Sequence, residues 1–209
     1  YEVIQSYGGR MVGFDRHMQR LTDGLKAIGM DNPMSAHAWL TTLTELLERN
    51  GSGPMGIYLQ VTRGVAPQRA HRFPAEVIPT LFAYPFTIES PSSGDISSAR
   101  SFSAVTGRDQ RWRRCHIKSV ALLGNVLHQM EGVNAGADEI LLFNERDELT
   151  EASACNVFVV IDGEVATPEL DSQKLPGITR NMLIDMMRDA GDWRIAERPV
   201  TREEVLAAD

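Results

Sequence analysis

The feature that most constrains the fold is the stretch IESPSSGDISS, residues 88–98. It is rich in serine, proline and glycine, a composition typical of a connection rather than of a helix or strand. It divides the 209 residues into two parts, each long enough to form a small domain. We therefore predict an N-terminal domain over residues 1–87, a linker over 88–98 and a C-terminal domain over 99–209.

The N-terminal part alternates β-rich and helical patterns. YEVIQSY and MVGF flank the glycine turn GGR and predict a β-hairpin. Asp15 is placed to cap a helix over residues 16–28, and a second helix is expected over residues 36–49. Two further strands are predicted in MGIYLQVTRG and VIPTLFAYPFTI.

The C-terminal part mixes strands and helices without strict alternation. One helix is expected over residues 119–133, with Val120, Leu123, Leu127 and Met130 at helical spacing, and another over residues 178–189. Strands are predicted in SFSAVTG, RWRRCHIK, EILLFN, CNVFVVID, EVATP and WRIAERPV. This pattern favours an α+β or α/β architecture in two layers over a doubly wound parallel sheet.

Charge and composition exclude several classes of protein. The formal net charge of −7 and the pI of about 5.3 argue against nucleic-acid binding, which needs a basic face. No apolar run approaches the ~18 residues of a membrane span. The two cysteines, Cys115 and Cys155, lie far apart, which predicts neither a disulfide nor a metal site and favours a cytoplasmic location.

Both ends of the sequence lie within patterned segments. Tyr1 opens directly in a strand-like run, and Thr201 with Glu204 predicts a capping box that starts a helix just before Asp209. We expect further segments on both sides.

Lys118 lies in the apolar stretch RCHIKSVALLGNVL, where the pattern changes from strand to helix. Removing water from an ammonium group is costly, so lysine is rarely buried. A lysine in this context either extends its amine to the surface or is retained for its chemistry.

Two clusters could bind anions. Arg108, Arg111, Arg113 and Arg114 surround Trp112, and the alternative is a solvated strand edge. Arg69 and His71 in QRAHRF would point the same way in an extended loop, which suits a carboxylate, although most loop cations are simply solvated.

Three further features could carry chemistry. Arg20 lies on the first predicted helix, where most arginines are solvated. Glu151 precedes the small residues ASAC and is either a ligand or a turn carboxylate. LPGITR, residues 175–180, opens a helix, where the N–H groups of Gly177, Ile178 and Thr179 could bind phosphate.

One cofactor explains these features together. A lysine can form a Schiff base with an aldehyde, and a carboxylate can keep a pyridine nitrogen protonated. A helix N-terminus with an arginine can hold a phosphate, and an Arg/His pair can hold a substrate carboxylate. These are the groups that pyridoxal 5′-phosphate requires.

At this point the sequence resembles the fold-type IV pyridoxal-phosphate enzymes. The motifs, in order, are YEVIQSY, HMQRL, RWRRCHIKSVALLGNVL, LTEASACNVFVV and LPGITR. The loop VTRGVAPQRAHRFP is similar to that of the D-amino acid aminotransferases. The resemblance implies a smaller N-terminal α/β domain, a larger barrel-like C-terminal domain, and a homodimer with shared active sites.

The resemblance also implies a role for each residue. Lys118 would hold the cofactor and move the proton of the substrate α-carbon, giving ping-pong transamination between a D-amino acid and a 2-oxo acid. The cofactor would contact Glu151, Arg20, Leu175, Gly177, Ile178 and Thr179. The substrate would contact Tyr1, Arg69, His71, Arg111 and Trp112, although Trp112 could equally be part of the core.

Three alternatives stay open. A branched-chain L-amino acid aminotransferase and an aminodeoxychorismate lyase share this fold and cofactor. A non-catalytic anion-binding or oligomerising domain would keep the fold without the chemistry.

Overall fold

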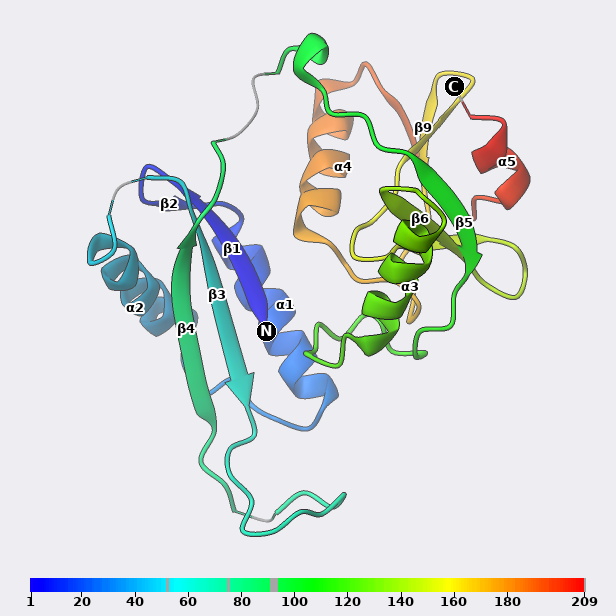
Figure 1. Cartoon of the computed structure of the whole chain (residues 1–209). Helices are drawn as coiled ribbons and strands as arrows, with labels where there is room; N and C mark the ends of the chain where they lie inside the picture. The colour runs from blue at the N-terminus through cyan, green and yellow to red at the C-terminus, as the bar shows by residue number, and fades with distance from the viewer. Residues whose placement is uncertain (52, 75, 91–93, 209) are drawn as a thin grey trace. The chain divides into compact units, whose positions relative to one another are not determined.

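The chain folds as two compact units, Tyr1–Gly94 and Asp95–Asp209, shown in Figure 1. The computed structural model describes residues 1–51, 53–74, 76–90 and 94–208. The predicted linker includes residues 91–93, which lie outside the described residues.

Unit 1 contains a four-stranded antiparallel sheet of order β2-β1-β3-β4. Its predicted hairpin is confirmed, with Gly8 and Gly9 at φ 57° and 78° in the turn, as a two-residue type I′ turn requires. The strands are β1 Glu2–Tyr7, β2 Arg10–Met11, β3 Met55–Thr62 and β4 Thr80–Thr87.

Two helices cover one face of this sheet, α1 Phe14–Ala27 and α2 Ala36–Glu48. The predicted Asp15 cap is wrong, because α1 begins earlier and its N-cap is Gly13. Asp15 lies instead in the first turn, where a negative charge favours the helix dipole. Helix α2 starts at Ser35, whose Oγ accepts the Ala38 N–H at 3.2 Å.

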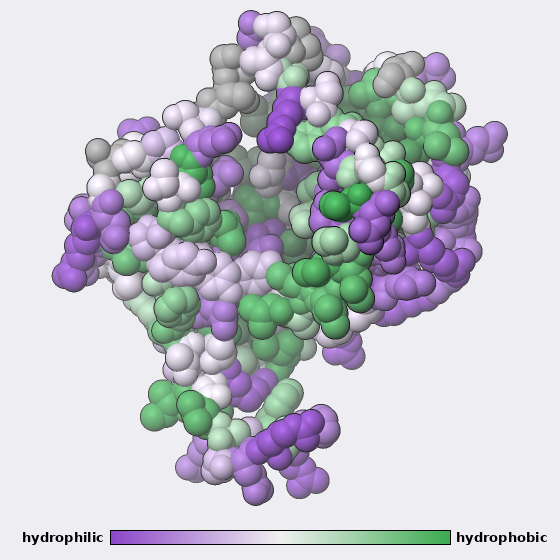
Figure 2. All heavy atoms as spheres, viewed as in Figure 1, coloured by the Kyte–Doolittle hydropathy of each residue, from purple (hydrophilic) through white to green (hydrophobic). Residues whose placement is uncertain are grey.

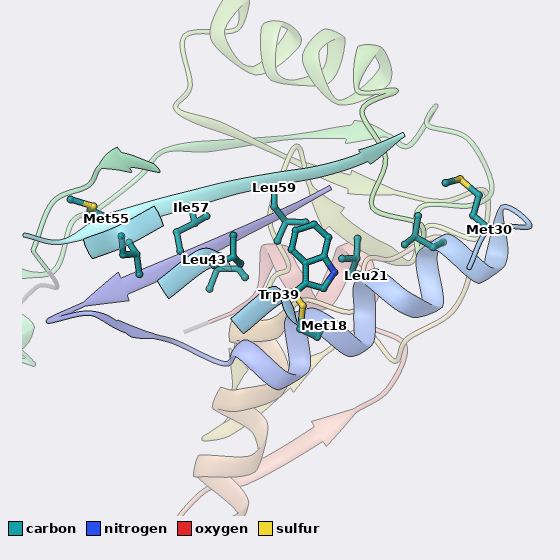
Figure 3. Packing of buried hydrophobic residues seen from close by; sticks show 11 residues of the cluster. Met18, Leu21, Met30, Trp39, Leu43, Met55, Ile57 and Leu59 are labelled. Carbon is teal, nitrogen blue, oxygen red and sulfur yellow. The ribbon is translucent and has the colours of Figure 1, made fainter. Parts of the chain in front are cut away.

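The core of unit 1 lies between the helices and the sheet. Figure 3 shows Trp39 of α2 among Met18 and Leu21 of α1 and Leu59 of β3. Trp39 is 2% exposed, and its indole N–H donates to Asn32 Oδ1 at 3.0 Å. This cluster fixes α1, and therefore the side chains that α1 carries, against β1.

Unit 2 is built from two three-stranded sheets, β5-β6-β7 and β8-β9-β10. Helix α3 connects the parallel strands β5 and β6, and α4 connects the parallel strands β9 and β10. The two sheets share one core, in which Phe143 and Leu149 of the first sheet pack with Val159 and Ala166 of the second. The elements are η1 Ile96–Ser98, β5 Ala104–Arg108, α3 Leu123–Asn134, β6 Glu139–Phe143, β7 Leu149–Ala152, β8 Val159–Ile161, β9 Glu164–Thr167, α4 Ile178–Ala190, β10 Arg194–Glu197 and α5 Arg202–Leu206.

The strand predicted in RWRRCHIK is wrong. Residues 111–118 form turns and bends, because Ile117 N–H donates to Arg114 O at 3.1 Å and Cys115 N–H to Ser172 O at 2.8 Å. Conversely, β7 was not predicted, because the four residues LTEA are too short and too polar for a recognisable strand pattern.

The helix predicted over residues 119–133 is present as α3, but it does not bury the apolar residues that stand at helical spacing. Its apolar residues Leu123, Leu127 and Met130 are 70%, 55% and 46% exposed, and the surface at the position of α3 is largely green in Figure 2. The helix instead buries His128 and Gly132. A Cβ on Gly132 would lie 3.2 Å from the Glu139 backbone, so the small residue allows α3 to approach β6 closely.

No helix among the described residues is long and apolar enough to cross a membrane.

Candidate active site

Strand β7 places Glu151 inside unit 2, where it is 5% exposed. Its Oε1 accepts the Leu175 N–H at 2.7 Å and the Asn156 Nδ2 at 2.8 Å. Its Oε2 accepts Arg111 Nη1 at 2.6 Å. Glu151 is therefore a buried, firmly held acceptor rather than an exposed turn carboxylate.

Burial raises the pKa of Glu151, and the nearby Asp109 charge adds to that rise. The Arg111 charge and hydrogen bond act against it, as does the Leu175 N–H. The protonation of Glu151 thus depends on a balance between desolvation and one guanidinium.

Arg111 has a different place from the one predicted. Its side chain is 4% exposed, with Nε and Nη2 donating to Asp109 at 3.0 and 2.7 Å and Nη1 donating to Glu151. Two protein carboxylates therefore occupy the guanidinium that was assigned to the substrate carboxylate. Trp112 is 48% exposed, so it is not part of the core.

Lys118 is half-buried and lies between the turns of residues 111–117 and helix α3. Hydrogen bonds connect the residues before and after Lys118 to the segments that contain Ser172 and Ser153. Cys115 N–H donates to Ser172 O at 2.8 Å, and Asn125 Nδ2 donates to Ser153 O at 2.6 Å. The lysine, glutamate and phosphate-loop motifs are thus linked by hydrogen bonds within one unit.

A lysine more deeply buried than Lys118 was missed by the sequence reasoning. The chain has three lysines, Lys26, Lys118 and Lys174. Lys174 is 6% exposed, and its amine donates to Asp171 at 2.9 Å. The ion pair gives this amine a structural partner, and the sequence carries no pattern that would have revealed it.

The predicted phosphate loop leads directly into α4. Gly177 is the N-cap and receives no side-chain cap, so the first N–H groups, including those of Ile178 and Thr179, lack intrahelical acceptors. Ile178 is buried, whereas Thr179 is exposed and Leu175 is half-buried. The loop is tied to β7 through Asn156, whose Nδ2 also donates to Leu175 O at 2.9 Å.

In unit 1, Arg20 is held by a carboxylate that the sequence reasoning did not single out. Glu2 is fully buried and accepts Arg20 Nε and Nη2 at 2.9 and 2.6 Å. His17 Nδ1 lies 2.7 Å from the same carboxylate. Burial would raise the pKa of Glu2, but the hydrogen bonds and charges of Arg20 and His17 outweigh it and lower that pKa.

Tyr1 lies at the end of a row of aromatic rings on the sheet of unit 1. Its ring stacks on Tyr58 with centroids 5.5 Å apart, and Tyr58 contacts Tyr84 at 5.3 Å. Burial is the main cause that raises the pKa of Tyr1. The charges of Glu2 and Arg20 also act on the Tyr1 phenol, so the Tyr1 end of the row lies near this ion pair.

Arg69 and His71 are exposed on the long loop between β3 and β4, which projects beyond the ends of these strands (Figure 1). The base of the loop is anchored by Arg63, which donates to Gly29 O and Ile28 O at 3.2 and 2.5 Å. The Arg63 guanidinium also lies 3.8 Å from the centre of the Phe73 ring. Within the described residues, neither Arg69 nor His71 has a hydrogen-bond partner.

In the part of the chain that the structure describes, no three His, Cys, Asp or Glu side chains are grouped to hold a metal ion.

The whole chain, residues 1–209, matches the family described as Amino-transferase class IV. It is 37% identical to the D-alanine aminotransferase of Bacillus licheniformis over 210 residues, covering 100% of this chain and 72% of that protein. It is 35% identical to the D-alanine aminotransferase of Staphylococcus haemolyticus over 210 residues, with the same coverage of 100% and 72%.

Solved structures show the same fold. A putative 4-amino-4-deoxychorismate lyase from Legionella pneumophila superposes with a TM-score of 0.85 at 23% identity, over 100% of this chain and 75% of the other. A branched-chain amino acid aminotransferase from Thermobaculum terrenum, in its PLP-form, gives 0.85 at 22% identity, over 99% and 69%.

Fold and site together define a class of enzyme, the fold-type IV aminotransferases. The chain belongs to the class IV aminotransferase family. The resemblance drawn from the five sequence motifs and the predicted fold class are both confirmed.

Proposed function

We propose that this chain is a pyridoxal-phosphate-dependent transaminase that moves the amino group of a D-amino acid, such as D-alanine, to a 2-oxo acid, such as 2-oxoglutarate. The observation that carries the proposal is its identity of 37% and 35% with two D-alanine aminotransferases over its full length. Arg69 and His71 are exposed in a loop similar to that of D-amino acid aminotransferases, which supports a D-amino acid as the substrate.

The residues of unit 2 fit the cofactor. A carboxylate has about four acceptor positions, and among the described residues three donors reach Glu151. One acceptor position therefore remains for a pyridinium N–H. The uncapped start of α4 suits a phosphate group. Leu175 is brought beside Glu151 in space, because its N–H donates to the Glu151 carboxylate at 2.7 Å, and it is proposed to pack against the ring.

Pyridoxal phosphate supplies an aldehyde carbon that accepts the amino group and a ring that withdraws electrons from the substrate. Lys118 Nζ would hold the cofactor at that carbon, and its free amine would move the proton of the substrate α-carbon as general base and then acid. Glu151 is proposed to hold the pyridine N–H. Arg20 and the N–H groups of Ile178 and Thr179 are proposed to bind the phosphate, next to Gly177.

The substrate carboxylate is assigned to Arg69, His71 and Tyr1, with Trp112 shaping the pocket. Arg69 and His71 lie on a projecting loop without partners among the described residues, which supports a homodimer in which this loop completes the site of a second copy. Arg111 is withdrawn from this set, because Asp109 and Glu151 occupy it. Cys115 and Cys155 are free thiols, which supports a reducing, cytoplasmic location.

The test is the visible absorption spectrum of the purified 209-residue chain with pyridoxal phosphate, before and after D-alanine, with L-alanine as control. We expect a bound-cofactor band that changes to the aminated-cofactor spectrum with D-alanine only. A response restricted to L-amino acids would support a branched-chain aminotransferase, and pyruvate release from aminodeoxychorismate without an amino acceptor would support a lyase. A protein that stays colourless would support a non-catalytic domain.

A further inference from the structure

Three charged side chains form a continuous row inside unit 2. Arg111 bridges Asp109 and Glu151, and the side chains of all three are at most 7% exposed. Thr150 Oγ1 donates to Asp109 Oδ2 at 2.7 Å, so the far end of the row is also fixed. The row contains two carboxylates and one guanidinium.

Arg111 is the member of this row that can govern the charge of Glu151. The Leu175 N–H and the Asn156 amide also donate to Glu151, but neither carries a charge. Asp109 opposes ionisation of Glu151, and Arg111 favours it. The thiols of Cys115 and Cys155 also respond to the Glu151 charge, and burial raises the pKa of Cys115 to about 11, so both stay neutral near neutral pH.

Geometry limits Arg111 to this role. Asp109 binds the guanidinium through two nitrogens, and Gln173 O accepts Nη2 at 3.2 Å. These bonds leave Nη1 directed to Glu151 at 2.6 Å. A two-pronged carboxylate contact of this kind fixes the plane of the guanidinium.

We propose that Arg111 is a positioning residue for Glu151: anchored on Asp109, its guanidinium keeps the Glu151 carboxylate ionised and oriented to accept a hydrogen bond from the cofactor. This inference rests on the proposed function only for the identity of that cofactor. The effect on Glu151 itself belongs to the chain alone and can be measured without cofactor.

The first experiment is an NMR titration of the cofactor-free chain labelled with ¹³C at the glutamate carboxyls, with Glu151→Gln to assign the signal. Arg111→Met should raise the pKa of Glu151, because the charge and the hydrogen bond of Arg111, which favour ionisation, are both lost. Asp109→Asn should lower it, because an opposing charge is lost. Opposite signs are the diagnostic result, since general loosening of the fold would move both variants in the same direction.

Arg113→Met is the matched control. Arg113 lies two residues away, pairs with Glu145 at 2.5 Å and is 66% exposed, so its loss should leave the Glu151 titration unchanged. Arg111→Lys keeps the charge and should restore most of the ionisation. If Arg111→Met unfolds, Asp109→Asn and Arg111→Lys still decide the matter. A Glu151 titration that Asp109→Asn leaves unmoved, or that Arg111→Lys shifts as far as Arg111→Met does, would overturn the proposal.

The second experiment measures the pyridoxal-phosphate dissociation constant and the pH dependence of the bound-cofactor absorption. In Arg111→Met, Glu151 should lose the charge that strengthens its hydrogen bond to the cofactor. Cofactor binding should therefore weaken by roughly ten- to a hundredfold and the absorption titration should shift, while Arg113→Met should match wild type. If wild type binds the cofactor and Arg111→Met binds it with the same dissociation constant and the same absorption titration, the positioning role is refuted. If wild type binds none, the proposed function fails, and the NMR result alone decides the role of Arg111.

Discussion

The side chain of Asn156 lies directly against the backbone of Gly177. A Cβ on Gly177 would come within 2.0 Å of Asn156 Oδ1, although Gly177 has an ordinary φ of −61°. Asn156 cannot move aside freely, because its amide bridges Glu151 and Leu175 O. Gly177 is therefore required for space rather than for backbone freedom.

From this relationship we predict that Gly177→Ala displaces Asn156 and loosens the start of α4. The stability loss should be about 1–3 kcal/mol, as for an overpacked site, measured by urea unfolding, and cofactor binding should weaken. Gly24→Ala is the control, because a Cβ there meets nothing within 4 Å and alanine favours a helix. Equal stability of the two variants would contradict the steric assignment.

Lys118 and Lys174 give a test of the covalent site. Borohydride reduction of the cofactor-loaded chain, followed by peptide mass spectrometry, should locate the cofactor on Lys118. Lys118→Ala should abolish transamination. Lys174→Ala should keep the covalent adduct while losing stability, because the buried Lys174 side chain and its ion pair with Asp171 are lost. An adduct on Lys174 in wild type would reverse the assignment.

Glu2 makes the stability of unit 1 dependent on acidity. Because the pKa of Glu2 is lowered from its usual 4.5, its contribution is complete above that value and is lost as pH falls through the folded-state pKa. Unfolding by urea from about pH 6 down to about pH 3 should show this loss. Glu2→Gln should be less stable at neutral pH by about 3–5 kcal/mol, as for a broken buried pair, with a flatter pH dependence.

The control for Glu2 is Glu45→Gln, an exposed partner of Arg49, for which we expect a change below about 1 kcal/mol. A pH profile of Glu2→Gln that parallels wild type would show that another carboxyl causes the acid sensitivity.

Arg69 and His71 should control substrate binding without affecting the fold. We expect Arg69→Met to lower kcat/KM for D-alanine by about ten- to a hundredfold, the loss of one charge-assisted contact, with an unchanged Tm because the side chain is exposed. Arg72→Met, an exposed change in the same loop, is the control. Similar losses in both variants would indicate a general effect of loop charge.

Trp39 tests the core that supports α1. Trp39→Ala should cost about 3–5 kcal/mol of unfolding free energy, since the side chain is 2% exposed and also donates to Asn32. Leu40→Ala, at a position 40% exposed on the same helix, should cost much less. Comparable losses would place the core of unit 1 elsewhere.

Local patterns in the sequence were sufficient for the elements that carry regular periodicity. Both helices of unit 1, its hairpin and α4 follow from apolar spacing, glycine turns and short-range caps, which depend on residues a few positions apart. The motifs around Lys118, Glu151 and residues 175–180 were also visible, because each is a continuous segment with a distinctive composition.

Only the tertiary structure decided how those segments are used. Strand β7 exists because its four residues pair with β6 and are buried, and no local pattern announces it. Arg111 left the substrate set because Asp109 and Glu151, the latter 40 residues away, compensate its charge inside unit 2. The sequence by itself therefore determined the class of chemistry. Long-range burial and charge pairing decided that Arg111 pairs with protein carboxylates instead of being available to a substrate, because a desolvated charge must find a partner, and Glu151 is not a sequence neighbour.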